Sequence, residues 1–178
     1  MKIQKNGLGI LAGIVAVLAV QISGQLAHAE ATRVTNPSAF LLEVGGRGLL
    51  YSFNFDRVVS DDLTFGIGYG SAPLTSADGI DTTRNASIIP VYVNLYLTRD
   101  QGSLYLTGGA DFITNSGSIT GYSANASGVT FQNTPILPTV GVGYENRSDA
   151  GFLVRITGYA LFGNSVKPWI GFSLGYSF

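Results

Sequence analysis

Apolar and small polar residues alternate strictly from Pro168 to Phe178. The residues on one side are Pro168, Ile170, Phe172, Leu174, Tyr176 and Phe178, and those on the other are Trp169, Gly171, Ser173, Gly175 and Ser177. A period of two places successive side chains on opposite faces of a β-strand and is incompatible with a helix. The segment is therefore predicted to be a strand with one apolar face.

The same alternation recurs upstream, in segments of the length that an outer-membrane strand requires. The eight predicted strands are residues 40–46, 49–56, 63–70, 91–98, 104–112, 139–145, 152–157 and 168–178. Residues 40–58 also fit one long strand that is kinked at its glycines. Because a closed bacterial barrel needs an even number of strands, a turn at Gly46-Arg47-Gly48 is favoured.

The connections between these strands alternate in length. Residues 59–62, 99–102 and 146–150 are short and polar, as periplasmic turns are. Residues 72–86 and 115–133 are longer and rich in Ser, Thr, Asn and Gly, and they are predicted to be extracellular loops. The connections at residues 46–48 and 163–167 are expected to be short on the outer side as well.

The N-terminal residues have the order of a secretory signal. Two lysines precede an apolar run from Leu8 to Val20, and Ala27-His28-Ala29 provides a small-x-small cleavage site. The apolar run is too short to cross a bilayer as a helix. We predict a cleavable signal peptide at residues 1–29 and one barrel domain at residues 30–178, with an uncleaved membrane anchor as the alternative.

The composition excludes several functions. Two of the 10 basic residues, Lys2 and Lys5, lie in the predicted signal, so eight basic residues face 11 acidic ones in the rest of the chain. No basic patch for nucleic acid results. The chain has no cysteine, and its single histidine, His28, also lies in the signal. Because imidazole is the usual general base near neutral pH, we expect no enzyme; we expect no metal or cofactor either.

The composition of the polar face indicates whether the apolar face of the sheet points outward to lipid or inward to a protein core. It consists mostly of Gly, Ser, Thr and Asn, whereas a water-facing surface would carry Lys, Glu and Arg. A sheet in lipid must close on itself so that every backbone group is paired. We therefore predict an all-β fold, an eight-stranded antiparallel transmembrane β-barrel with an up-and-down meander, located in the bacterial outer membrane. A secreted β-sandwich or a lipocalin-like barrel, with its apolar face inward, is the alternative.

Aromatic residues near the strand ends fit the girdle that such barrels place at the membrane surfaces. They are Tyr69, Tyr144, Phe152, Tyr176 and Phe178. The final residues from Gly171 to Phe178 also resemble the C-terminal signal of outer-membrane barrel proteins. This resemblance implies that the barrel-assembly machinery recognises Phe172, Leu174, Tyr176 and Phe178.

In size and layout, residues 30–178 are similar to the eight-stranded barrels of the OmpA/OmpX type. The resemblance implies a Gram-negative cell envelope, with outer-membrane lipid and lipopolysaccharide around the barrel. Full-length OmpA also has a periplasmic peptidoglycan-binding domain, which we do not expect here. The segment from Glu43 to Ser52 resembles the opening hairpin of small outer-membrane barrels, and no role is attached to it.

Five charged residues fall on the predicted inward face: Glu43, Asp56, Asp111, Glu145 and Arg155. Burial of an unpaired charge is costly. We therefore predict a polar plug in which Arg155 bridges carboxylates, with Arg47 close to the first turn. The tyrosines expected to support this plug are Tyr92, Tyr105 and Tyr159. A salt-bridged filler is one interpretation of this network, and the gate of a narrow pore is the other.

The two long loops are candidate binding surfaces, because a rigid scaffold often carries its binding residues on loops. Residues 72–86 include Asp78, Asp81 and Arg84, and residues 115–133 include Tyr122 and Phe131. The alternative is a pair of solvated loops without a specific ligand. We expect a non-enzymatic structural or adhesin-like role, with a narrow channel for small solutes or ions as the second hypothesis.

Overall fold

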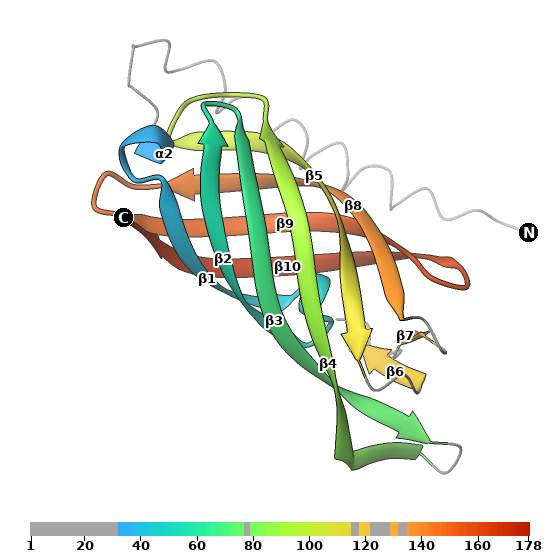
Figure 1. The fold of residues 1–178 in the computed structure, drawn as a ribbon. Coiled ribbons are helices and arrows are strands. Elements are labelled where there is room, and N and C mark those ends of the chain that lie inside the picture. The colour runs from blue at the N-terminus through green and yellow to red at the C-terminus, as the bar shows by residue number, and fades with distance from the viewer. Residues whose placement is uncertain (1–31, 77–78, 115–117, 122–128, 132–134) are drawn as a thin grey trace, which may run out of the picture.

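Eight antiparallel strands form a barrel in the computed structural model (Figure 1), which describes residues 32–76, 79–114, 118–121, 129–131 and 135–178. The predicted signal peptide lies outside these residues. The barrel strands are β1 (Ser38–Gly45), β2 (Tyr51–Ser60), β3 (Leu63–Ser76), β4 (Gly79–Tyr96), β5 (Gly102–Thr114), β8 (Ile136–Arg147), β9 (Phe152–Phe162) and β10 (Val166–Ser177). No helix in the described part of the chain is long and apolar enough to cross a membrane.

The barrel closes through the first and last strands. Each strand pairs with the next one along the chain, and β1 pairs with β10 in a register that runs from Ala39↔Ser177 to Gly45↔Gly171. This closed meander confirms the predicted fold class. Strands β1 and β2 also pair with each other, so residues 40–58 form a hairpin rather than one kinked strand.

The two ends of the barrel differ. One end, called here the turn end, carries the chain termini of the barrel and the short connections at residues 61–62, 97–101 and 148–151. The other end, called the loop end, carries the longer connections and the tips of β3 and β4 (Figure 1). The three connections predicted to be short turns lie together at the turn end, whereas the short connections at residues 46–50 and 163–165 lie at the loop end, as the sequence predicts.

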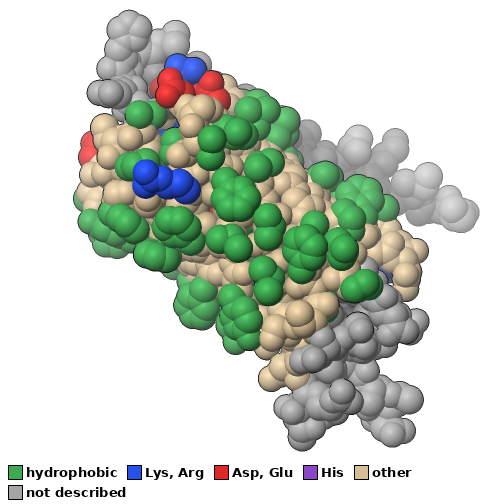
Figure 2. Space-filling model, in the orientation of Figure 1, with side chains coloured by type: hydrophobic (Ala, Val, Ile, Leu, Met, Phe, Trp, Pro, Cys, Tyr) green, Lys and Arg blue, Asp and Glu red, His purple; other side chains and the backbone are tan. Residues whose placement is uncertain are grey.

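Side chains alternate between the outside and the lumen along every barrel strand. On β9, Phe152, Val154 and Ile156 are 69%, 40% and 50% exposed, whereas Leu153 and Arg155 are buried. Hydrophobic side chains spread over the visible side of the barrel in Figure 2, and acidic side chains gather near one end of that view. The apolar face points outward, which is the opposite of a lipocalin-like barrel.

The prediction of a loop at residues 72–86 is wrong. β3 and β4 continue past the barrel wall as a hairpin, with Leu74↔Asp81 and Ser76↔Gly79 in register and an irregularity after Pro73. The ladder continues because each added pair satisfies backbone groups that water would otherwise bind. Asp78 lies outside the described residues, and Arg84 is described only as part of β4.

The predicted loop at residues 115–133 also contains strands, β6 (Ser118–Gly121) and β7 (Val129–Phe131), which pair with each other. β6 pairs with β3 at Leu74↔Ile119, while β4 occupies the opposite edge of β3. β6 therefore continues on the edge where the pairing with β2 ends, at Tyr51↔Ser71. Tyr122 lies outside the described residues.

The turn between β1 and β2 folds into the barrel. Its 3-10 helix η1 (Gly46–Gly48) is buried, and Gly45 before it has φ 69° and ψ −136°. A left-handed φ of this kind is accessible to glycine at little cost but strains other residues. The predicted turn residues are confirmed, and the glycine backbone lets the turn bend inward and place Arg47 in the lumen.

Replacing Gly45 by alanine tests this turn. A β-carbon at Gly45 would lie 2.5 Å from the Ile170 carbonyl oxygen, in addition to the strain of the positive φ. We expect Gly45→Ala to destabilise the barrel by about 1–3 kcal/mol. The midpoint of heat-induced gel-mobility change in detergent measures this. Gly108→Ala is the control, because nothing lies within 4 Å of its added β-carbon; an equal midpoint for both variants would contradict the prediction.

Candidate functional site

The lumen contains all the buried charges of the described residues, and they balance. Each is at most 5% exposed. The acidic ones are Glu43, Asp56, Asp111 and Glu145, and the basic ones are Arg33, Arg47, Arg147 and Arg155. Four residues of each sign balance in formal charge, which limits the cost of removing them from water.

Arg155 lies between two carboxylates at the centre of the lumen. Its Nη2 is 2.6 Å from Oδ2 of Asp56, and its Nε donates to Oε2 of Glu145 at 2.5 Å. Tyr92 donates to Asp56 at 2.6 Å, and Tyr96 donates to Glu145 at 2.7 Å. The arginine therefore bridges two acidic groups, in the arrangement that the sequence predicts, and each carboxylate has a second, phenolic donor.

Strand register produces this cluster. Glu145 on β8 and Arg155 on β9 are directly opposite each other in the antiparallel ladder. Opposite charges at such positions are close enough to pair. Arg147 also contacts Glu145, at 3.2 Å, because β8 continues through it. The sequence assigned Arg147 to a turn at residues 146–150; that prediction is wrong, since the ladder with β9 extends to Arg147↔Leu153.

A second cluster forms around the inward turn. Glu43 accepts hydrogen bonds from the Arg47 backbone N–H at 3.2 Å and from the Tyr159 hydroxyl at 2.7 Å. The Arg47 guanidinium donates to Tyr159 at 3.2 Å and to Thr107, and it lies 4.0 Å from the ring centroid of Tyr92. Tyr92 thus contacts both clusters, since its hydroxyl belongs to the first one.

Asp111 is placed differently from the other predicted lumen residues. It is completely buried, yet neither carboxylate oxygen has a hydrogen-bond partner among the described residues, and it forms no ion pair there. On the ladder it lies between Pro90 and Leu137. The structure therefore places Asp111 inside the lumen but outside the two bonded clusters, at the border of an apolar layer.

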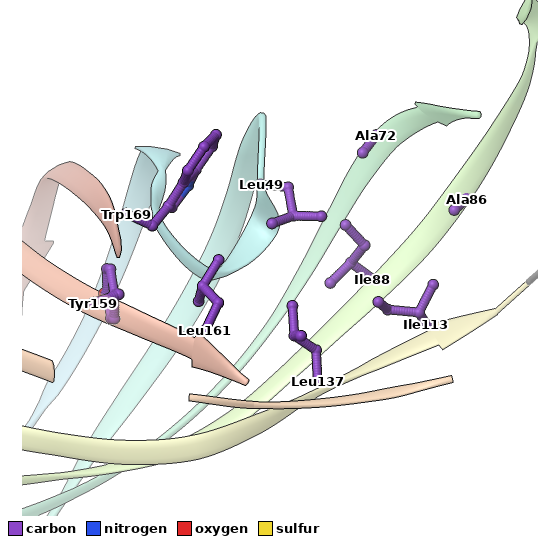
Figure 3. Packing of buried hydrophobic residues seen from close by; sticks show 9 residues of the cluster. All are labelled: Leu49, Ala72, Ala86, Ile88, Ile113, Leu137, Tyr159, Leu161 and Trp169. Carbon is purple, nitrogen blue, oxygen red and sulfur yellow. The ribbon is translucent and has the colours of Figure 1, made fainter. Parts of the chain in front are cut away.

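That apolar layer fills the loop end of the lumen (Figure 3). Its members are Leu49, Ala72, Ala86, Ile88, Ile113, Leu137, Tyr159, Leu161 and Trp169. Small inward residues such as Gly, Ser and Thr are expected from the sequence, and this apolar layer is a difference from that expectation. The alternation itself indicates this layer. Ile113, Leu137 and Leu161 each lie two positions from an inward residue of the same strand (Asp111, Thr139 and Tyr159), so they share its face.

Little space remains between the side chains. The cavity between the two charged clusters measures about 10 Å³, which is room for roughly one water molecule. It is lined by Leu41, Glu43, Arg47, Asn54, Tyr92, Tyr105, Arg155, Tyr159 and Ser173. Of the tyrosines predicted to support the plug, Tyr92 and Tyr159 bond to charged groups and Tyr105 bonds to Thr157 at 2.5 Å.

Comparison with solved structures identifies the architecture. The chain is similar to the N-terminal β-barrel domain of Pseudomonas aeruginosa OprF, with a TM-score of 0.56 and 11% identity over 80% of this chain and 98% of that one. The fold is that of an eight-stranded outer-membrane β-barrel. The resemblance to OmpA/OmpX-type barrels is thereby confirmed at the level of the fold.

A second similar structure is the Yersinia pestis outer membrane protein Ail in a phospholipid bilayer nanodisc. Its TM-score is 0.49, with 11% identity over 80% of this chain and 99% of that one. No family model and no curated protein sequence matches the chain. Among the described residues, no three Asp, Glu, His or Cys side chains gather as metal ligands.

Removing Arg155 should destabilise the barrel strongly. Arg155→Ala leaves Asp56 and Glu145 buried without the cation that they share. Breaking a buried pair in this way typically costs about 3–5 kcal/mol. We expect a lower midpoint of heat-induced gel-mobility change, partly recovered when Asp56→Asn removes the carboxylate that is left without a cation, since Glu145 keeps its contact with Arg147. Arg99→Ala, which removes an exposed ion pair with Asp62, is the control and should change the midpoint little. An Arg155→Ala/Asp56→Asn double variant no more stable than Arg155→Ala would contradict the electrostatic explanation.

Proposed function

We propose that this chain is a non-enzymatic barrel of the bacterial outer membrane with a structural or adhesin-like role. The outward apolar surface supports the membrane location, because the closed ladder leaves no sheet edge of the barrel exposed to lipid. The turn end would face the periplasm and the loop end the cell exterior, as short periplasmic turns and longer outer loops are typical of such barrels.

The packed lumen is the observation that carries the proposal. Two charged clusters and an apolar layer lie one after another along the barrel axis, with about 10 Å³ of cavity between the clusters. An apolar layer across the lumen opposes the passage of ions, since it offers them no hydrogen bonds. A barrel filled in this way serves as a scaffold rather than a conduit.

The loop end supplies a surface for interaction. β3 and β4 have 14 and 18 residues, whereas about 9–11 residues cross a bilayer as a strand. The excess forms the hairpin that projects from the barrel in Figure 1, and β6 adds to its edge. A rigid sheet above the membrane would present any binding residues at low entropic cost. The residues 72–86 and 115–133 remain the proposed contact region.

Export and assembly complete the proposal. The predicted signal at residues 1–29 would direct the chain across the inner membrane. Phe172, Leu174, Tyr176 and Phe178 all face outward and are about half exposed, so they are accessible to the barrel-assembly machinery and later to lipid and lipopolysaccharide. Phe178 stacks on Phe40, with 5.6 Å between ring centroids, across the strand pair that closes the barrel.

Planar-bilayer recording separates the scaffold from the narrow channel. We expect no resolved conductance steps from the wild-type barrel or from Arg155→Ala, because the apolar layer persists in both. The channel hypothesis instead predicts steps that grow when Arg155, the proposed gate, is shortened. Arg99→Ala at the turn end controls for a general effect of removing a cation. Reproducible steps that depend on Arg155 would overturn the scaffold proposal.

Single cysteines test the orientation, because the chain has none of its own. On intact cells, a membrane-impermeant maleimide should label Thr75→Cys in the β3–β4 extension but not Ser60→Cys at the turn end. Both should react after the outer membrane is opened. The reverse pattern would invert the proposed orientation.

A variant without the β3–β4 extension tests the adhesin-like role. Leu74–Ser76 and Gly79–Asp81 lie beyond the barrel wall, so replacing residues 74–81 with Asn-Gly should leave the amount of heat-modifiable barrel in the outer membrane unchanged. We expect cells with this variant to attach less to extracellular matrix than cells with the wild-type protein. Equal attachment at equal barrel levels would leave a structural role and exclude this hairpin as the contact.

A further inference from the structure

Arg33 enters the lumen at the turn end from the short helix α2 (Thr32–Thr35). Its side chain is only 3% exposed, although it comes from outside the barrel strands. Nη2 donates to the Ser103 hydroxyl at 2.8 Å and to the Thr98 carbonyl at 3.4 Å. The guanidinium carbon lies 3.5 Å from the ring centroid of Tyr96, so the cation sits on the aromatic face.

The chain between Arg33 and β1 is also fixed to the barrel. The Asn36 carbonyl accepts a hydrogen bond from the Arg147 guanidinium at 3.0 Å, and the Pro37 carbonyl accepts one from the Val58 N–H at 2.8 Å. Residues 32–37, which directly precede β1, therefore fold back over the opening of the lumen instead of extending away from the barrel.

The charge balance of the lumen explains why Arg33 is buried at the turn end. The barrel strands and η1 supply four buried acidic groups but only three buried arginines, and Arg33 is the fourth. Tyr96, on whose ring Arg33 lies, donates its hydroxyl to Glu145. The aromatic ring is thus polarised by an acceptor at its edge, which favours a cation on its face.

We propose that the turn end of the lumen is a guanidinium-binding site, formed by Tyr96, Ser103 and the Thr98 carbonyl, which the chain fills with its own Arg33. Residues 32–37 are a tethered plug that closes this end of the barrel. The site selects guanidinium over ammonium because a planar ion covers the ring face while one of its nitrogens, Nη2, reaches both oxygen acceptors. Lysine would present a point charge without that geometry.

Chemical rescue tests the site. Arg33→Ala should lower the heat-shift midpoint of the purified barrel by about 3–6 °C. Millimolar guanidinium chloride, far below denaturing concentrations, should restore most of that loss, whereas equimolar sodium or ammonium chloride should not. Arg33→Lys should also fail to restore it. Arg99→Ala, with its exposed cation, is the control and should gain nothing from guanidinium.

Two results would overturn the site. One is an Arg33→Ala barrel as stable as wild type. The other is a loss that ammonium or Arg33→Lys reverses as well as guanidinium does, since any nearby cation would then suffice. Tyr96 provides an independent comparison: the effect of Arg33→Ala should persist in Tyr96→Phe, which keeps the ring, and largely vanish in Tyr96→Leu.

Accessibility tests the plug separately from stability. Ser103 is 1% exposed and lies beneath Arg33. A small cationic thiol reagent should modify Ser103→Cys slowly in the folded barrel and at least tenfold faster when Arg33→Ala is added, with guanidinium slowing the reaction again. Equal rates in both backgrounds would show that residues 32–37 do not close the mouth. This outcome is independent of what the loop end binds or of whether the barrel conducts.

Discussion

The pairing of β1 with β10 is the contact on which the rest of this structure depends. It converts a sheet with two free edges into a closed ladder, so backbone groups of the barrel are satisfied within the wall. Only then can an apolar face cover the outside. Because side chains alternate, the same closure sends every second residue into a lumen too narrow for water to fill, and those residues must satisfy one another.

The strand register determines which lumen residues can pair with one another. Glu145 and Arg155 face each other on adjacent strands, and Asp56 reaches the same arginine from β2 across the barrel. Neighbouring positions on the ladder bring Arg147 to Glu145 as well. The ion pairs among Asp56, Glu145, Arg147 and Arg155 are therefore a consequence of strand pairing and parity, and each of these ions has at least one further polar donor or acceptor.

Side chains that face the lumen because of strand alternation could be predicted from the sequence. The path of the chain outside the predicted strands could not. Asp56, Glu145 and Arg155 were identified because a period of two is a local property. Arg47 was expected only near the first turn and Arg33 was not identified, because these residues enter the lumen from a turn and from the N-terminal segment, where no alternation applies. Residues 72–86 have the Ser-, Thr-, Asn- and Gly-rich composition of a loop, and composition does not show that β3 and β4 remain paired beyond the barrel wall. The deficit of predicted inward cations was the available sign that further arginines were missing.

The two ends of the lumen are closed by different chemistry, and the difference bears on where function can reside. Aliphatic side chains and Trp169 occupy the loop end, while Arg33 and Tyr96 occupy the turn end. With water excluded from both sides, the charges between them interact in a low-dielectric interior, where each depends on its partners more than it would at a surface. The paired charges thus form the polar core that stabilises the folded barrel. In the described part of the chain, the outer surface and the β3–β4 extension are then left to meet other molecules, and the extension projects beyond the barrel wall.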